Sequence, residues 1–255
     1  MDNQTPYQLQ MQPLNHELLA IANAPVEPGE FPCIHNASQL FKQWDTFDNR
    51  ILKSKNGQLL VACSTQMPNV TPAMIDWWFA WHLTHSERYQ LWHPQAHKKA
   101  TVKHDRSHLN NARDVYIDNV SYVDEYIGDE LLKLSISFYH PNKIGLHDLE
   151  AQGATAICAR TALRHPKLDS GHLVHLVEPT ATGCVMKSVF WLGDVKLHTP
   201  LLGPILTPLI NTALVRKLAL KEHSATNLIA HCVEEMNHLP RFLPQLYQKL
   251  KGQLT

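Results

Sequence analysis

His231 and Glu235 are four residues apart in the segment NLIAHCVEEMNHL, residues 227–239, which contains no glycine or proline and is followed by Pro240. Such a segment is typical of a helix that ends before the proline. Residues i and i+4 lie on one face of a helix, one turn apart, so this imidazole and this carboxylate can bind the same metal ion. Both are ligand types that suit zinc. An isolated HxxxE pattern more often makes only a surface hydrogen bond, so a metal site needs further ligands from elsewhere in the chain.

Aromatic and histidine side chains are concentrated in residues 77–97. This segment contains Trp77, Trp78, Trp81, Trp92, His82, His85, His93 and His97. The tryptophans bury large apolar areas and can form a pocket wall, and we expect two or more of them simply to fill the core. At least two of the four histidines are expected to be packing or hydrogen-bonding residues, which leaves the others as candidate metal ligands.

Four longer motifs surround these residues. They are WWFAWH at 77–82, RYQLWHPQAH at 88–97, VDEYIG at 123–128 and HxxxE at 231–235. Together they resemble the 2,4-diacetylphloroglucinol hydrolase and phloretin hydrolase family, zinc-dependent hydrolases that cleave the carbon–carbon bond between an acyl group and a phenol ring. The resemblance extends from about Trp77 to about Leu239, and its motifs are much more specific than HxxxE alone.

The resemblance implies a set of site residues. The implied ligands of one zinc ion per chain are His97, Glu125, His231 and Glu235. The implied substrate-binding residues are Tyr89, Trp92 and Phe190, and the implied catalytic groups are His175 and Tyr89. Glu130 is an alternative to Glu125, because it is close in the sequence. Family members that act on the diacylated phenol have a tyrosine on a late strand where this chain has Phe190, which leaves the exact substrate open.

The implied reaction is a hydrolytic retro-Claisen cleavage. An acylated phloroglucinol-type ring can tautomerise to a ketone, after which water adds to the acyl carbonyl and the carbon–carbon bond breaks. The electrons remain on the ring as an enolate, which returns to a phenol. The expected partner is therefore a small phenolic ketone. The alternative is a non-catalytic protein of the same fold that binds an aromatic or lipid-like molecule, because a fold alone does not define a function.

Composition and motif content argue against several other classes. Lys plus Arg and Asp plus Glu are both 23, without a basic cluster, so neither nucleic acid nor a membrane surface is an expected partner. We find no apolar run long enough to span a bilayer, no signal peptide in residues 1–10, and no HExxH, GxSxG or P-loop motif. Five scattered cysteines without CxxC spacing favour reduced thiols and a cytoplasmic protein. A homodimer is compatible with these features, and the oligomeric state is left open.

The N-terminal part of the chain must support these residues rather than supply them. Residues 1–35 are polar and spotted with proline, which predicts a loosely structured arm. With a small elaboration this arm extends over residues 1–70, and a metal-dependent hydrolase domain follows over 71–255. Thr71 before Pro72 predicts the start of a helix that continues to about Tyr89, with Pro94 interrupting the pattern beyond it.

The middle of the chain has the alternating pattern of strands. Strands are predicted at 59–63, 113–125, 132–138, 154–162, 172–177 and 183–192. Successive strands without helices between them imply an antiparallel sheet. After Gly193 the chain turns apolar, and helix is predicted from Ile205 onward to Leu239, with Pro208 near a helix start. The family resemblance implies an α+β fold in which a curved antiparallel sheet grips the long C-terminal helix, the helix-grip arrangement of Bet v 1-like proteins.

Overall fold

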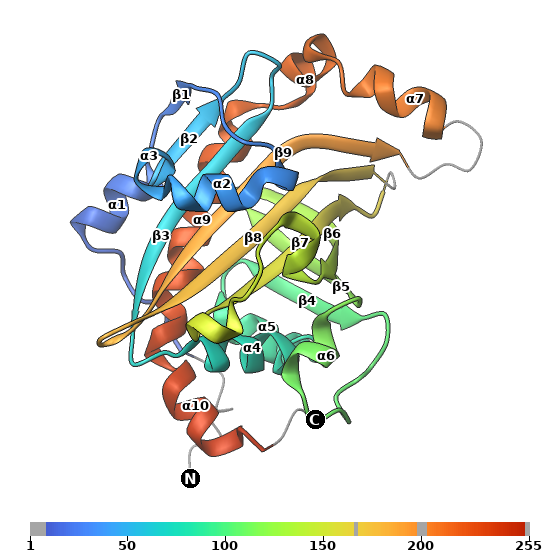
Figure 1. Ribbon diagram of the computed structural model, residues 1–255. Helices are drawn as coiled ribbons and strands as arrows, with labels where there is room; N and C mark the ends of the chain where they lie inside the picture. Colours follow the sequence, from blue (N-terminus) through green and yellow to red (C-terminus); the bar gives the residue numbers. More distant parts are fainter. Residues whose placement is uncertain (1–8, 166–167, 198–202, 253–255) are drawn as a thin grey trace.

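The computed structural model describes residues 9–165, 168–197 and 203–252. A curved sheet with the strand order β1-β2-β3-β9-β8-β7-β6-β5-β4 forms its centre (Figure 1). The strands are β1 Val26–Pro28, β2 Arg50–Lys53, β3 Leu59–Pro68, β4 His97–Val102, β5 Val120–Ile127, β6 Glu130–Tyr139, β7 Thr155–Leu163, β8 Leu168–Thr180 and β9 Gly183–Leu197. Neighbouring strands are antiparallel except β1 and β2, which run parallel. The predicted antiparallel sheet is therefore confirmed for all but its first strand.

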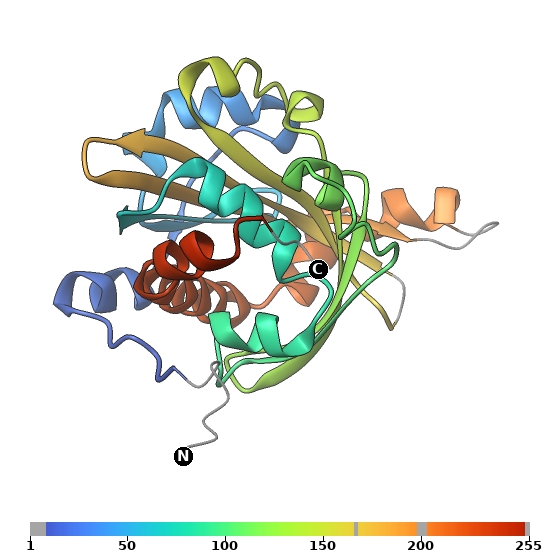
Figure 2. The same ribbon diagram turned by 90° about the horizontal axis from the view of Figure 1, so that it is seen from below.

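One long helix near the C-terminus lies in the concave face of the sheet (Figure 2). The α-helices are α1 His16–Ala22, α2 Ala37–Lys42, α3 Trp44–Phe47, α4 Pro72–Trp81, α5 Ser86–Trp92, α6 Ala112–Tyr116, α7 Gly203–Ile210, α8 Ala213–Ala219, α9 Glu222–His238 and α10 Leu243–Leu250. Short 3-10 helices are η1 Ile34–Asn36, η2 Pro141–Ile144, η3 Glu150–Gln152 and η4 Leu239–Arg241. The predicted helix-grip arrangement is present, with α9 as the gripped helix.

The two faces of the sheet build two separate apolar cores, because successive side chains of a strand point to opposite faces. On β8, Leu173 and Val177 belong to the core that contains α9, whereas Val174 and Leu176 belong to the core under α2 and α3. His175 lies between Val174 and Leu176 in sequence and is directed to the α9 side. The alternation thus places one polar side chain of β8 in the interior facing α9.

The structure corrects two of the predicted elements. Residues 113–116, predicted as strand, belong to α6, whose start is stabilised by the Asn111 side chain accepting a hydrogen bond from the Arg113 amide at 2.9 Å. The helix predicted from Pro72 to Tyr89 is divided into α4 and α5. The break follows His82, whose ring Nδ1 lies 2.7 Å from the Trp78 carbonyl oxygen in the last turn of α4.

The N-terminal part is more ordered than the predicted loose arm. It contains α1 and supplies β1, β2 and β3 to the sheet, with β3 paired to β9 along its whole length. Residues 1–8 lie outside the described part of the chain. The division at residue 70 stays a prediction, although strands on both sides of it pair within one sheet.

Thr71 caps α4, as its position before Pro72 predicted. Its hydroxyl accepts a hydrogen bond from the Met74 amide at 3.3 Å, and its backbone is extended, with φ −110° and ψ 158°. We expect Thr71→Ala to lower the free energy of unfolding by about 1 kcal/mol, because the amide loses its partner. Chemical denaturation would measure the change. Thr71→Ser keeps the hydroxyl and should be close to wild type, whereas equal stability of all three proteins would contradict the role of the cap.

All five cysteines are free thiols, and the Cys63 and Cys232 sulfur atoms approach each other to 3.8 Å between β3 and α9. Among the described helices, none combines the length and the apolarity that crossing a membrane requires.

Candidate active site and metal centre

The inward face of α9 carries His231 and Glu235 one turn apart, as the HxxxE spacing predicted. Both side chains are buried, and His231 Nε2 lies 3.7 Å from Glu235 Oε2. The helix is held against the sheet by Ile229, Val233 and Met236, which are fully buried in the same core. The apolar side chains of α9 therefore fix the direction in which the polar pair points.

His97 and Glu125 reach the same place from the sheet. They are opposite one another in the register of β4 and β5, and His97 Nε2 is 3.7 Å from Glu125 Oε2. The same nitrogen is 3.5 Å from Glu235 Oε2 on α9. The structure thus brings together all four residues that the sequence motifs predicted as ligands. Glu130 instead begins β6, is exposed, and contributes to the wall of a neighbouring cavity.

The nitrogen and oxygen atoms of this cluster fit a divalent cation. One ligand atom each of His97, His231 and Glu235 lies within 4.8 Å of the others. His97 Nδ1 is 2.9 Å from the Tyr89 carbonyl oxygen, so Nδ1 carries the proton and the lone pair of Nε2 faces the cluster. This Nε2 is buried and has no hydrogen-bond partner among the described residues. Two imidazoles and two carboxylates are a ligand set that suits zinc.

The shifted pKa values in the cluster also favour a bound divalent cation. Burial raises the pKa of Glu125 to about 7, and burial followed by the charge of Glu125 raises the pKa of Glu235 well above its usual value. Burial also lowers the pKa of His97 well below its usual value and that of His231 to about 3. The histidines are therefore neutral, while two charged carboxylates here would be costly without compensation. A divalent cation supplies that compensation.

Tyr89 and Trp92, both on α5, contact the cluster. The Tyr89 hydroxyl donates a hydrogen bond to Glu125 Oε2, and its ring stacks on His97 with the centroids 3.7 Å apart. Burial, followed by the charge of Glu125, raises the pKa of Tyr89 well above its usual value, so the hydroxyl remains a donor. Trp92 Nε1 donates to the Glu235 carbonyl oxygen at 3.1 Å. The indole thereby attaches α5 to α9, and it also lines the adjacent pocket.

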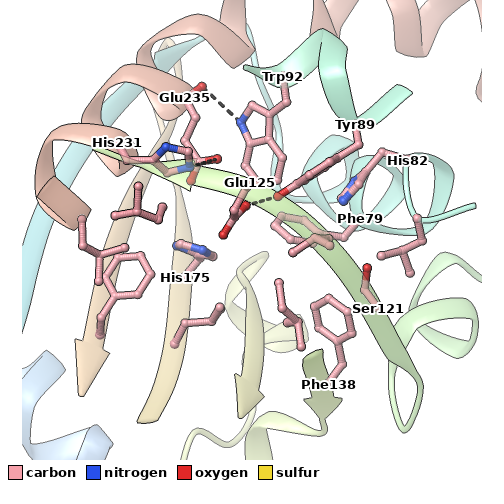
Figure 3. Close-up of a pocket in the computed structure, with 17 residues that line it drawn as sticks. Phe79, His82, Tyr89, Trp92, Ser121, Glu125, Phe138, His175, His231 and Glu235 are labelled. Carbon is pink, nitrogen blue, oxygen red and sulfur yellow. Dashed lines mark hydrogen bonds and ion pairs between the residues drawn. The ribbon is translucent and has the colours of Figure 1, made fainter. Parts of the chain in front are cut away.

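His175 and Phe190 approach the pocket from the sheet. His175 Nδ1 lies 2.9 Å from Ser188 Oγ on the neighbouring strand β9, and burial lowers the pKa of His175 to about 3. The ring centroids of His175 and Phe190 are 5.8 Å apart in an edge-to-face arrangement. Figure 3 shows His231, Glu235, Glu125, Tyr89 and His175 directed toward one pocket. A neutral imidazole thus faces the carboxylate and phenol groups across an apolar space.

The pocket has two parts of very different size. A recess of about 70 Å³ beside the cluster is lined by several rings, among them Phe79, Tyr89, Trp92 and Phe138. A cavity of about 760 Å³ shares Glu125 and Phe190 with this recess and extends toward the start of α9. Of the four clustered tryptophans only Trp92 lines either space, and the other three fill the core, as expected for at least two of them.

Two further residues near the pocket, Ser188 and His82, were not predicted as site residues from the sequence. Ser188 holds His175 through the register of β8 and β9, which pairs them directly. His82 lies in the wall of the recess, with its Nδ1 bonded to the Trp78 carbonyl oxygen. The alternation of β9 places Ser188 on the same face as Phe190, but only the strand register identifies its partner, and register is not visible in one sequence.

Comparison with known proteins identifies a matching family model and two curated relatives. The family model described as DAPG hydrolase PhiG domain matches residues 32–248. The 2,4-diacetylphloroglucinol hydrolase of Pseudomonas protegens is 33% identical over 190 residues, which are 71% of this chain and 62% of that protein. The phloretin hydrolase of Eubacterium ramulus is 28% identical over 203 residues, 77% of this chain and 70% of that protein. The chain thus spans less than two thirds of the length of the first relative.

Solved structures give a weaker match. Truncated norcoclaurine synthase from Thalictrum flavum aligns with 68% of this chain and 93% of its own, at 15% identity and a TM-score of 0.33. A likeness at that score carries no argument about this protein. The family match, by contrast, covers most of the chain and includes every residue of the cluster around His97. The chain belongs to the DAPG hydrolase PhiG domain family.

Proposed function

We propose that this protein is a zinc-dependent hydrolase that cleaves the carbon–carbon bond between an acyl group and a phenolic, phloroglucinol-type ring. The convergence of His97, His231 and Glu235 with Glu125 in one buried cluster carries the proposal. The printed names of the relatives, 2,4-diacetylphloroglucinol hydrolase and phloretin hydrolase, support the substrate class. A protein that only binds a ligand has no need for two buried carboxylates and two neutral imidazoles at one point.

The four proposed ligands are His97, Glu125, His231 and Glu235. A bound zinc ion would supply Lewis-acid polarisation of an oxygen atom. The chain itself fixes the ligands in advance, because the Tyr89 carbonyl orients His97 and the Tyr89 hydroxyl orients Glu125. Such supporting hydrogen bonds hold ligands in their binding orientation.

The proposed reaction consumes one water molecule. The phenol ring first takes its ketone tautomer, with a proton on the ring carbon that bears the acyl group. Water then adds to the acyl carbonyl carbon, and the bond between that carbon and the ring breaks. The bonding electrons stay on the ring as an enolate, which is protonated to the phenol while a carboxylic acid leaves. The atoms of acylphenol and water are thus all accounted for in the acid and the phenol.

The protein's own groups would serve the proton transfers in this sequence. His175 is neutral and faces the pocket, so it is suited to accept a proton from water and return it to the ring. The Tyr89 hydroxyl donates its proton to Glu125, so its oxygen is suited to accept a hydrogen bond from a phenolic hydroxyl of the substrate. The apolar rings around the recess limit access of bulk water to the reacting acyl carbonyl.

The proposal is tested by metal analysis and an assay panel on one preparation. We expect about one zinc ion per chain in protein purified without added metal, and release of carboxylic acid from at least one acylphenol. Chelation should abolish turnover, and zinc should restore it. A folded protein that takes up no zinc and hydrolyses no acylphenol would instead be a binding protein of the same fold, and the proposal would be wrong.

Phe190 is expected to influence the choice among acylphenols. It lines both parts of the pocket where diacylated-phenol hydrolases have a tyrosine, so a substrate oxygen near it lacks a hydroxyl partner. An unpaired buried polar group costs about 1–3 kcal/mol. We therefore expect diacetylphloroglucinol not to be the best substrate of the wild-type protein. Phe190→Tyr should raise kcat/KM for the diacylated ring relative to the mono-acylated ring by about 5- to 150-fold.

Phe138→Tyr is the matched control for this prediction, because Phe138 also lines the recess but lies on β6. Steady-state kinetics with both substrates would give the ratio for each variant. An unchanged ratio in Phe190→Tyr, or the same increase in both variants, would show that position 190 does not select the substrate.

A further inference from the structure

The recess beside the cluster and the larger cavity share part of their walls. Both are lined by Glu125, Ile127, Ile136, Leu173, Phe190 and Leu228. The catalytic groups Tyr89 and His175 line the recess, whereas the larger cavity extends from Glu125 toward Leu220 and Lys221 at the start of α9. A substrate whose reacting bond lies at Glu125 would therefore place one end in each space.

The volumes of the recess and the larger cavity indicate which end of the substrate each of them accepts. The recess measures about 70 Å³, and a cavity that accommodates benzene has about 150 Å³. The recess is thus too small for a phenol ring but large enough for an acetyl-sized group. The volume of the other cavity, about 760 Å³, lies in the range found for binding sites of drug-sized ligands. Such sites are usually preformed. It exceeds what a ring with only hydroxyl groups would fill.

Aliphatic and polar side chains both line the larger cavity. Leu132 and Leu134 from β6, Leu163 from β7, Leu192 from β9 and Leu220 line it. Its polar side chains include Thr161 and Ser170, whose hydroxyls lie 3.2 Å apart and satisfy each other. Charged groups such as Glu130 and Lys221 also line it and are partly or fully exposed to solvent. An occupant of this space gains mainly from burying apolar surface.

We propose that the leucine-lined cavity binds an extended apolar substituent on the phenol ring, while the recess admits only a small acyl group. This inference rests on the proposed function and narrows its substrate class to short-chain acylphenols that carry an alkyl or prenyl-like chain on the ring. Cleavage would then release a short carboxylic acid and an alkylated phenol.

Binding of ring analogues tests the cavity without turnover. Resorcinols with alkyl chains of increasing length have no acyl group, and their affinity for the zinc-loaded protein can be measured by calorimetry. Each methylene that enters the cavity should tighten binding by roughly fourfold until the cavity is filled. Affinity that does not depend on chain length would overturn the proposal.

Cavity-filling variants identify the space that binds the chain. Leu134→Trp and Leu163→Trp should abolish the dependence of affinity on chain length. Leu131→Trp is the matched control, because Leu131 is on the same strand as Leu134 but 42% exposed and outside the cavity lining. The two variants lie on different strands, so a folding defect in one leaves the other informative. Chain-length dependence retained in both folded variants would contradict the assignment.

Two substrate series separate this inference from the proposed function. With an acetyl group fixed, lengthening a ring alkyl chain should raise kcat/KM; with the ring fixed, lengthening the acyl group from acetyl to hexanoyl should lower it by at least tenfold. Faster hydrolysis of long acyl groups would overturn the inference and leave the function standing. Chain-dependent binding without hydrolysis of any compound would support the cavity assignment and overturn the function.

Discussion

His97→Ala is expected to lose its zinc and nearly all acylphenol hydrolysis. His97 is the residue that joins the two halves of the cluster, because its Nε2 faces Glu125 on β5 and Glu235 on α9 at 3.7 and 3.5 Å. Loss of a group that only orients a metal ligand already costs about 10–100-fold in metal affinity or activity. Loss of a ligand itself should therefore cost at least about 100-fold in both. Elemental analysis after dialysis and the acylphenol assay measure the two quantities on the same sample.

The controls for this variant separate metal loss from unfolding. His108→Ala removes an exposed histidine and should keep both zinc and activity. Glu125→Gln should weaken zinc binding, whereas Glu130→Gln should not, because only Glu125 lies beside His97. Circular dichroism would verify that each variant is folded. A folded His97→Ala protein that retains one zinc ion per chain would refute the proposed ligand set.

The elements that the sequence predicted best are those whose pattern is local. Residues 132–138 alternate apolar and polar side chains, and β6 covers them. The segment before Pro240 lacks helix-breaking residues, and α9 ends at His238. The spacing of His231 and Glu235 was for the same reason readable without a structure, because a helix places such a pair on one face.

The elements that were predicted wrongly depend on single side-chain contacts. The residues of α6 have β-favouring Val115 and Tyr116, yet the Asn111 cap and burial of both side chains in the core make this segment helical. Local propensity is weak enough for such contacts to override it. The strands β1, β2 and β4 were missed because they are short, and because the pairing that creates them comes from residues distant in the sequence.

The non-local part of the site could not be derived from spacing. His97 and Glu125 are 28 positions apart, and only the register of β4 with β5 sets them opposite each other. Motif resemblance supplied these residues without explaining their geometry. The leucine-lined cavity had no sequence signal, because its leucines come from four strands and from the segment around α9 and look like ordinary core residues. An empty space is a property of packing between elements, which a sequence pattern does not encode.

His175→Phe is expected to lower kcat by about 10²–10⁴-fold while leaving the zinc content unchanged. That range is typical of losing a general acid–base group, and His175 is not among the four proposed ligands. Phenylalanine keeps a ring in a pocket that already contains Phe79 and Phe190, so the wall should remain packed. Ser188→Ala removes the partner of Nδ1 and should give a smaller loss, because the imidazole remains present but is less well oriented. Single-turnover kinetics and elemental analysis of the three proteins give both readouts.

The pH dependence of the activity lost in His175→Phe shows whether His175 is neutral or charged in the working enzyme. Burial lowers the pKa of His175 to about 3, so the imidazole loses its proton far below neutrality and is neutral from about pH 5 to pH 8. The ratio of wild-type to His175→Phe activity should therefore be constant over that range. A histidine with its ordinary pKa would instead make the ratio change near about pH 6.5. A change of the ratio at that pH would mean that the pocket does not keep His175 neutral over this range, and the expectation of a pH-independent ratio would be wrong.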